Sequence, residues 1–230
     1  MHYCCSAATI TDTACRSPTF QGSRNLCLVK VECGPDLYGW GEAGLSGREL
    51  AVKGVVEHYA QFLVGQDGMR IGALWQEMYR SQYFEGGRTL TAAISAIDIA
   101  LYDCLGKKLG VPVYQLLGGA HRHHIPCFVS CAADVETVKA RVKEGWQCIR
   151  IGIAGGSPAE APRAGATPTP TDLEQTYEPR LCIARSVEAF TKVRAAVGPG
   201  PCLGTDYHTR LSVAECGSLL QKLPPGTLDW

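Results

Sequence analysis

Apolar and polar positions alternate most clearly between residues 25 and 43. The alternation over residues 26–31 predicts a strand, and Gly34-Pro35-Asp36 predicts a turn. Residues 38–43 are then the expected returning strand of an antiparallel hairpin. A glycine stands on each side of Trp40, which indicates the close approach of another backbone.

A helical period follows the hairpin. Apolar residues recur at steps of three and four over residues 50–63, 71–78 and 90–105, which predicts three helices. Residues 83–88 interrupt this pattern with two glycines among aromatic and charged residues. Such a segment is typical of a lid over a binding site, and equally of a plain connection between helices.

Two acidic residues, Asp98 and Asp103, lie on the third predicted helix. Residues five apart on a helix diverge by about 140°, so these carboxylates do not share a face. We therefore expect hydrogen-bonded structural residues and not a catalytic pair.

Strands and helices alternate after residue 120, which marks a boundary between a first domain of residues 1–120 and a second of residues 121–230. The alternation is typical of an α/β fold with a parallel sheet and right-handed crossovers. The expected strands are residues 125–130, 148–153 and 203–206 with a beginning strand at 228–230, and the expected helices are 135–143, 181–197 and 213–222. Residues 152–180, rich in Gly, Ala, Pro and Thr, predict a long loop that is either functional or disordered.

The chain carries 22 Lys and Arg against 22 Asp and Glu in 230 residues, so its formal net charge is zero. No basic cluster indicates a nucleic-acid partner, and no apolar run reaches the roughly 18 residues of a membrane span. We expect a soluble cytoplasmic protein. The 12 cysteines lack a C-x-x-C pattern, which favours small buried residues in a reducing compartment over disulfides or thiolate metal ligands.

The most informative polar residues come at the end of the expected strand 203–206. Asp206 and His208 point the same way in an extended segment, and ligand sites of parallel α/β folds lie at the carboxyl ends of strands. Asp206 as a helix cap with His208 as a solvated loop residue explains the spacing equally well.

Several stretches, in order from about residue 24, resemble the mandelate racemase and muconate-lactonizing subgroup of the enolase superfamily, and within it the acid-sugar dehydratases. These stretches are residues 28–31, Gly39-Trp40-Gly41-Glu42-Ala43, residues 96–107, residues 110–119 and Asp206-Tyr207-His208-Thr209-Arg210-Leu211-Ser212.

The resemblance implies an α+β capping domain followed by a TIM-type (β/α) barrel, of which this chain holds about the first four strands. It also implies Mg²⁺-dependent dehydration of a sugar acid, a hydro-lyase reaction through an enediolate, with a possible homo-oligomer. Asp206 matches a metal carboxylate, and His208 matches the general acid. Arg150 stands where a lysine or arginine of the family acts, and its permanent charge suits an electrostatic clamp. Residues 83–88, with Tyr83 and Arg88, match the substrate-covering loop.

Two departures from the family pattern stand out. A tyrosine of the mannonate-type enzymes is replaced in the region of Pro162-Arg163-Ala164, and the family continues beyond Trp230 to its remaining metal ligands. We expect a truncated dehydratase-like chain that lacks a complete active site and is inactive alone. The alternatives are a non-catalytic remnant or subunit, and a racemase or cycloisomerase, which Ile149-Arg150-Ile151-Gly152 disfavours because it lacks the racemase lysine pair.

Overall fold

The computed structural model describes residues 9–10, 12–16, 26–45, 47–84, 86–152, 178–208 and 210–230. The chain divides at residue 123 into two units, Met1–His123 and His124–Trp230, and each is described by itself. The expected loop over residues 152–180 and the Pro162-Arg163-Ala164 region fall almost wholly outside the described residues.

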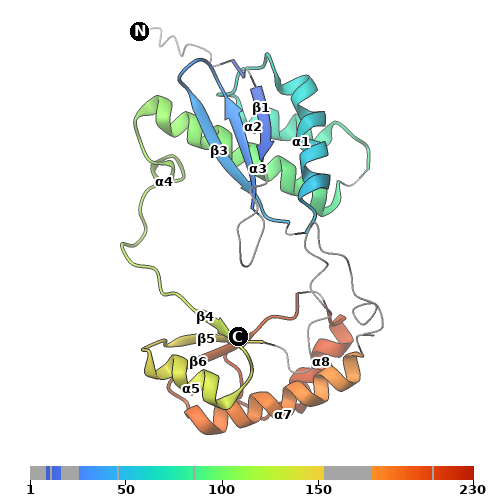
Figure 1. Cartoon of the computed structure of the whole chain (residues 1–230), viewed down its shortest axis with the longest axis vertical. Helices are drawn as coiled ribbons and strands as arrows, with labels where there is room; N and C mark the ends of the chain where they lie inside the picture. The colour runs from blue at the N-terminus through green and yellow to red at the C-terminus, as the bar shows by residue number, and fades with distance from the viewer. Residues whose placement is uncertain are drawn as a thin grey trace. The chain divides into compact units, whose positions relative to one another are not determined.

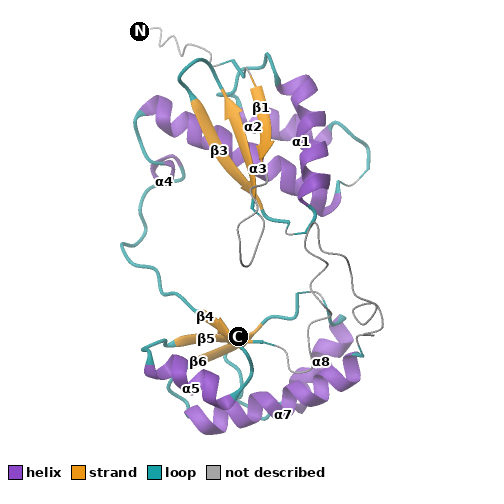
Figure 2. Ribbon diagram, viewed as in Figure 1, coloured by secondary structure: helices purple, strands orange, loops and turns teal. Residues whose placement is uncertain are grey.

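In the first unit, three antiparallel strands pack against helices (Figures 1 and 2). The strands β1 (Asp12–Arg16), β2 (Cys27–Glu32) and β3 (Tyr38–Ala43) are joined in that order. They are followed by α1 (Glu49–Leu63), α2 (Ile71–Arg80), α3 (Gly87–Leu109) and the short α4 (Val113–Leu116). The expected hairpin is confirmed, with Lys30 paired to Trp40 in the β2–β3 register.

Helix α3 lies against the inner face of this sheet. A Cβ atom on Gly39 would lie 1.9 Å from the carbonyl oxygen of Ala100, and one on Gly41 would lie 1.9 Å from that of Ala96. The glycines beside Trp40 therefore do mark a close backbone approach. By length and composition α3 could cross a membrane, but its packing against β3 is that of a core helix.

The two acids on α3 have structural surroundings. Asp103 accepts a hydrogen bond from the Trp40 backbone N–H at 2.9 Å and pairs with Lys107 at 2.8 Å. Burial raises the pKa of Asp98. Asp103 thus ties α3 to β3, as expected for a structural carboxylate.

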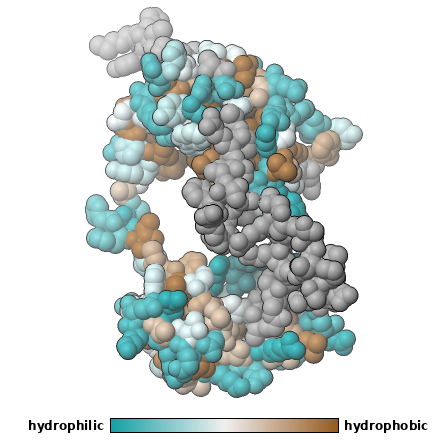
Figure 3. Space-filling view, in the orientation of Figure 1, coloured by the Kyte–Doolittle hydropathy of each residue, from teal (hydrophilic) through white to brown (hydrophobic). Residues whose placement is uncertain are grey.

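The second unit is a parallel three-stranded sheet with helices between its strands. Its elements are β4 (Val129–Cys131), α5 (Val135–Lys143), β5 (Cys148–Ile151), α7 (Pro179–Val197), β6 (Cys202–Thr205) and α8 (Val213–Lys222), with strand order β4-β5-β6. Val138 of α5 and Phe190 of α7 are fully buried with Ile149 and Leu203 of the sheet. On the face shown in Figure 3, hydrophilic residues cover much of the outside of α5 and α7.

The strand boundaries of the second unit differ from expectation. Of the expected strand 125–130 only Val129 and Ser130 pair with β5, together with Cys131, so residues 125–128 are loop. The expected strand 148–153 ends as a strand at Ile151, and the expected strand 203–206 is observed at 202–205. Residues 228–230 are not assigned as a strand, although Asp229 and Trp230 exchange backbone hydrogen bonds with Leu203 and Thr205. The segment therefore runs beside β6 without forming a full ladder.

Nine cysteines whose side chains the structure describes are free thiols. Four are buried, four are half-buried, and Cys127 is exposed; the buried ones are Cys27, Cys33, Cys104 and Cys182. The expected packing role holds for the buried and half-buried thiols and fails for Cys127.

Candidate functional site

Three charged or titratable side chains meet at the carboxyl ends of β5 and β6. The Oδ2 atom of Asp206 lies 3.2 Å from Nη1 of Arg150 and 3.0 Å from Nε2 of His208. Arg150 on β5 pairs with Gly204 on β6, which lies two residues before Asp206. The Arg150 side chain therefore reaches the Asp206 carboxylate from the neighbouring strand. The parallel register thus brings together the three residues that the sequence singled out.

The turn after β6 orients His208. Its backbone N–H donates to Oδ1 of Asp206 at 2.8 Å, and its φ of 44° lies in the left-handed region, which non-glycine residues seldom adopt. The side-chain-to-backbone bond offsets part of the cost of this conformation. His208 is 73% exposed, so its imidazole is accessible to a ligand while it also contacts Asp206.

Arg150 is held on two further sides. Its Nε donates to Oγ of Ser130 at 3.0 Å, and its guanidinium carbon lies 5.4 Å from the centre of the Phe128 ring. Trp230 contacts the same phenyl ring edge-on, at 5.4 Å between centroids. Sequence reasoning missed these three neighbours, because no spacing in the chain joins residues 128, 150 and 230.

The Tyr207 side chain holds the turn after β6 against the hydrophobic side chains around it. Its ring packs on a small cluster that includes Ile183 of α7, Leu219 of α8 and Leu211 in the segment before α8. Burial raises the pKa of Tyr207 to about 12. Because this ring is tucked inward, Asp206 and His208 on either side of it can face outward. The alternation of Asp206-Tyr207-His208 was the available signal for this residue.

Tyr83 and Arg88 belong to the first unit. Tyr83 is 99% exposed and meets Phe84 edge-on at 5.6 Å between ring centroids. Arg88 lies on the first turn of α3 and is exposed. A pocket of about 180 Å³ is lined by Ser81, Gln82, Phe84 and Gly86 and by side chains of α1, α2 and α3 such as Tyr59, Met78 and Ile94.

The described residues do not by themselves fit a Mg²⁺ ion. Among them there is no group of three or more His, Cys, Asp or Glu residues that could hold a metal. Asp206 offers one carboxylate, whose oxygens are engaged by Arg150 and by the backbone and ring of His208. Mg²⁺ requires a near-octahedral set of oxygens, so its other ligands would have to come from outside the described residues.

Comparison with known sequences identifies the first unit. Residues 8–118 match the family described as mandelate racemase / muconate lactonizing enzyme, N-terminal domain. This match covers the sheet β1-β2-β3 and helices α1 to α4.

Relatives with assigned names match over 90% of the chain. A "D-galactonate dehydratase family member" of Pseudarthrobacter chlorophenolicus is 34% identical over 228 residues. A "D-mannonate dehydratase" of a Sphingomonas species is 35% identical over 224 residues. The chain spans 56% of the first relative and 55% of the second, which is about half of their length.

Among solved structures, an enolase from Pantoea ananatis with bound D-gluconate and magnesium superposes with a TM-score of 0.79 at 29% identity. The likeness covers 96% of this chain and 58% of that one. It confirms the expected α/β class, in which an α+β unit is followed by the parallel β/α repeats of an incomplete barrel.

Proposed function

Since residues 8–118 match the N-terminal domain of the mandelate racemase / muconate lactonizing enzyme family, we propose that the site formed by Arg150, Asp206 and His208 serves the dehydration of a sugar acid. The observation that carries the proposal is the convergence of these three side chains. Nη1 of Arg150 lies 3.2 Å, and Nε2 of His208 lies 3.0 Å, from the Oδ2 atom of Asp206. Relatives that match 90% of the chain and are named D-galactonate or D-mannonate dehydratases support the same class of substrate.

Dehydration of a sugar acid removes the proton beside the carboxylate and a hydroxyl group from the next carbon, through an enediolate. The leaving hydroxyl must gain a proton to depart as water. His208 is the proposed donor of that proton, because its imidazole is exposed and histidine is the side chain that most often acts as a general acid. Its contact with Asp206 keeps the ring oriented.

Arg150 has a different part in the proposal. A guanidinium remains protonated throughout the physiological range, so it cannot remove the substrate proton. Its planar fork instead suits a carboxylate, and the proposed role is to hold the acid group of the substrate and the charge that develops on it. Tyr83 and Arg88 are proposed as substrate-binding residues on the ground of the family resemblance alone.

Asp206 is proposed as one ligand of a divalent cation, Mg²⁺, which would stabilise negative charge on the substrate. Among the described residues Asp206 is the one carboxylate at this site, which favours a second candidate, a non-catalytic binding module. With one carboxylate at the site, we expect the 230-residue chain to bind the metal without turning over a substrate.

Calorimetric titration of Mg²⁺ into the purified chain, with and without D-gluconate, tests the proposal. Binding in the millimolar range or tighter should be lost in Asp206→Asn and kept in Asp36→Asn, a matched change in an exposed turn. Arg150→Gln should weaken gluconate binding without abolishing metal binding. Equal Mg²⁺ binding by the Asp206→Asn variant would defeat the assignment.

Turnover is measured separately. The chain and His208→Asn are incubated with Mg²⁺ and a panel of aldonates, and any 2-keto-3-deoxy acid is detected with a carbonyl reagent. Turnover by the chain would contradict the expectation that one carboxylate is insufficient. Turnover that His208→Asn leaves unchanged would remove His208 from its proposed role.

A further inference from the structure

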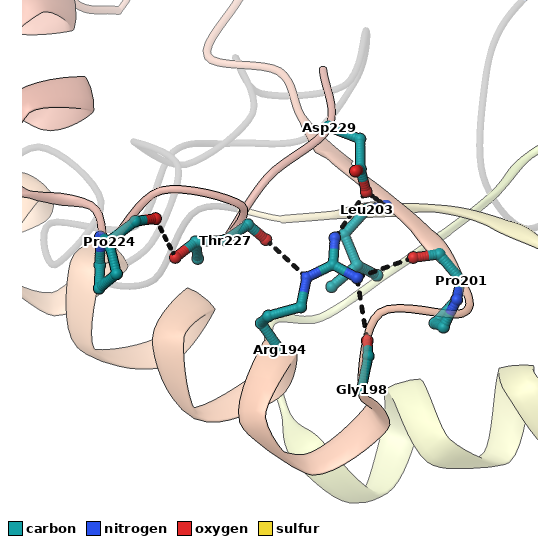
Figure 4. Close-up of polar contacts among 7 residues, drawn as sticks. All are labelled: Arg194, Gly198, Pro201, Leu203, Pro224, Thr227 and Asp229. Carbon is teal, nitrogen blue, oxygen red and sulfur yellow. Dashed lines mark hydrogen bonds and ion pairs between the residues drawn. The ribbon is translucent and has the colours of Figure 1, made fainter.

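Arg194 reaches from the last turn of α7 to four oxygen acceptors. It donates to the carbonyl oxygens of Thr227 at 3.1 Å, Gly198 at 3.0 Å and Pro201 at 2.9 Å, and to Oδ2 of Asp229 at 2.5 Å (Figure 4). Its side chain is only 14% exposed. A charged group buried to this degree is held by its partners, so the cluster fixes the loop before β6 and residues 227–229 against each other.

Asp229 extends this cluster to β6. The same Oδ2 atom accepts a hydrogen bond from the Leu203 backbone N–H at 2.8 Å. The Asp229 N–H donates to the Leu203 carbonyl at 2.7 Å, and the Thr205 N–H donates to the Trp230 carbonyl at 3.1 Å. Residues 227–230 are thereby held in one register beside β6, and we call Arg194 and Asp229 together the latch.

The latch determines where Trp230 lies. With its backbone bonded to Thr205, the Trp230 indole lies over Gly204, where a Cβ atom would come within 2.2 Å of the ring. The neighbour of Gly204 in the β5–β6 register is Arg150. The indole therefore fills the space beside Arg150 that a side chain at residue 204 would otherwise take.

Trp230 acts on Arg150 through Phe128. The indole packs edge-on against the phenyl ring, and the phenyl ring lies under the Arg150 guanidinium. The Arg150 side chain is 27% exposed, and a long arginine side chain has many rotamers in water. A fixed aromatic surface on one side and Ser130 on another restrict those rotamers to the one that faces Asp206.

We propose that Arg194 is a positioning residue of the candidate site, which acts through Asp229, Trp230 and Phe128 to keep the Arg150 guanidinium directed at Asp206. Its value for function rests on the proposed role of Arg150. Whether Arg150 is held is nevertheless a property of the free chain, and it can be measured without substrate or metal.

The Nε–H group of Arg150 is the probe, because it donates to Ser130 and lies next to the phenyl ring. In the full 230-residue chain with ¹⁵N-labelled arginine, its signal is assigned by its disappearance in Arg150→Lys. Arg194→Met, which removes all the donors of the latch, should speed exchange of this proton with water at least about tenfold and shift its resonance. Circular dichroism checks that the variant is folded.

Three further variants separate positioning from general stability. Trp230→Ala keeps the latch but removes the ring, and should produce the same change at Arg150, whereas Trp230→Phe should largely restore the signal. Glu188→Gln breaks the exposed Lys192–Glu188 pair on the same helix and should leave the signal unchanged. An unaltered Arg150 signal in folded Arg194→Met overturns the proposal, and if that variant does not fold, an unaltered signal in Trp230→Ala overturns it.

The two proposals fail in different ways. Absence of Asp206-dependent metal binding would defeat the proposed function and would leave the Arg150 signal of the unmodified chain as it is. An Arg150 signal insensitive to the latch would defeat the positioning role and leave metal binding as it is.

Discussion

The indole ring of Trp230 occupies the space in which a side chain at residue 204 would lie. A Cβ atom on Gly204 would be 2.2 Å from Cε2 of the indole, well inside van der Waals contact. Gly204 is therefore required by packing, because Trp230 lies across it. Since Arg150 is the register partner of Gly204, this packing belongs to the surroundings of the candidate site.

Gly204→Ala should push the indole away from β6. We expect a loss of about 1–3 kcal/mol in the free energy of unfolding, because the added methyl group and the ring cannot share the space. Urea denaturation followed by tryptophan fluorescence measures the stability and the new environment of the ring together. Gly200→Ala, at a position with open space around it, should change stability by no more than about 0.5 kcal/mol. Equal stability of the two variants would contradict the packing argument.

Gly41→Ala should be more damaging, because the atom it meets is backbone. Its Cβ would lie 1.9 Å from the carbonyl oxygen of Ala96, and α3 would have to move off the sheet. The expected cost is about 3 kcal/mol or more in the free energy of unfolding. The control is Gly54→Ala on α1, which has open space and should gain about 0.5–1 kcal/mol of helix stability. A Gly41→Ala variant as stable as the unmodified chain would mean that α3 does not approach β3 this closely.

Local periodicity was sufficient to predict most of the helices. The expected helix 213–222 is α8 without change, and expected 50–63 is α1 from Glu49 to Leu63, because an amphipathic stripe and its end signals are written in neighbouring residues. Strand β1 was missed, since its pairing with β2 is a non-local contact and residues 12–16 alternate only weakly. The expected strand 125–130 began before the observed start at Val129, because its pairing with β5 is also a non-local contact.

The sequence predicted those residues of the site that lie at the ends of strands. Arg150, Asp206 and His208 were expected from their positions and from a family resemblance, and the structure brings them within hydrogen-bonding distance. The supports of Arg150 were not predictable, because Ser130 and Phe128 reach it only through the β4–β5 register. Trp230 can pack against Phe128, the aromatic neighbour of Arg150, only because residue 204 has no side chain. Such contacts depend on three-dimensional packing that no spacing encodes.

The latch should make the second unit sensitive to acid. The hydrogen bond from the Leu203 N–H and the charge of Arg194 hold the pKa of Asp229 below its ordinary value. A carboxylate whose pKa is lowered in the fold contributes stability above its unfolded pKa of about 3.9, and that contribution is lost as pH falls through the lower folded value. Asp229→Asn should therefore show a smaller fall in melting temperature between about pH 7 and about pH 3 than the unmodified chain.

The control for this acid effect is Asp36→Asn, in an exposed turn of the first unit. It should retain the full acid dependence of the unmodified chain. If Asp229→Asn retained it too, the ionised carboxylate would not be contributing to the stability of the folded unit.

Tyr207 should make an opposite contribution at high pH. Burial raises its pKa to about 12, against an ordinary value near 10, so folding favours the neutral phenol. The resulting stability is present below about pH 10 and is lost as pH rises towards 12. Its hydroxyl lies beside Ser186 but has no hydrogen-bond partner of normal geometry among the described residues. Tyr207→Phe should therefore change the free energy of unfolding at neutral pH by no more than about 1 kcal/mol, while Tyr207→Ala should cost about 3 kcal/mol.

Alkaline titration of the tyrosine absorbance distinguishes these contributions. The unmodified chain should have a tyrosine that ionises near pH 12, and Tyr207→Phe should remove it. Burial also raises the pKa of Tyr59, so the late ionisation should be reduced in that variant by one tyrosine. Ionisation of every tyrosine at the ordinary pKa would contradict the buried position of the ring. Because the same ring anchors the turn between Asp206 and His208, Tyr207→Ala, unlike Tyr207→Phe, should also abolish the Asp206-dependent binding of Mg²⁺. Comparison of Tyr207→Phe with Tyr207→Ala would then distinguish the effect of the buried phenol hydroxyl from the structural support that the ring gives to the site.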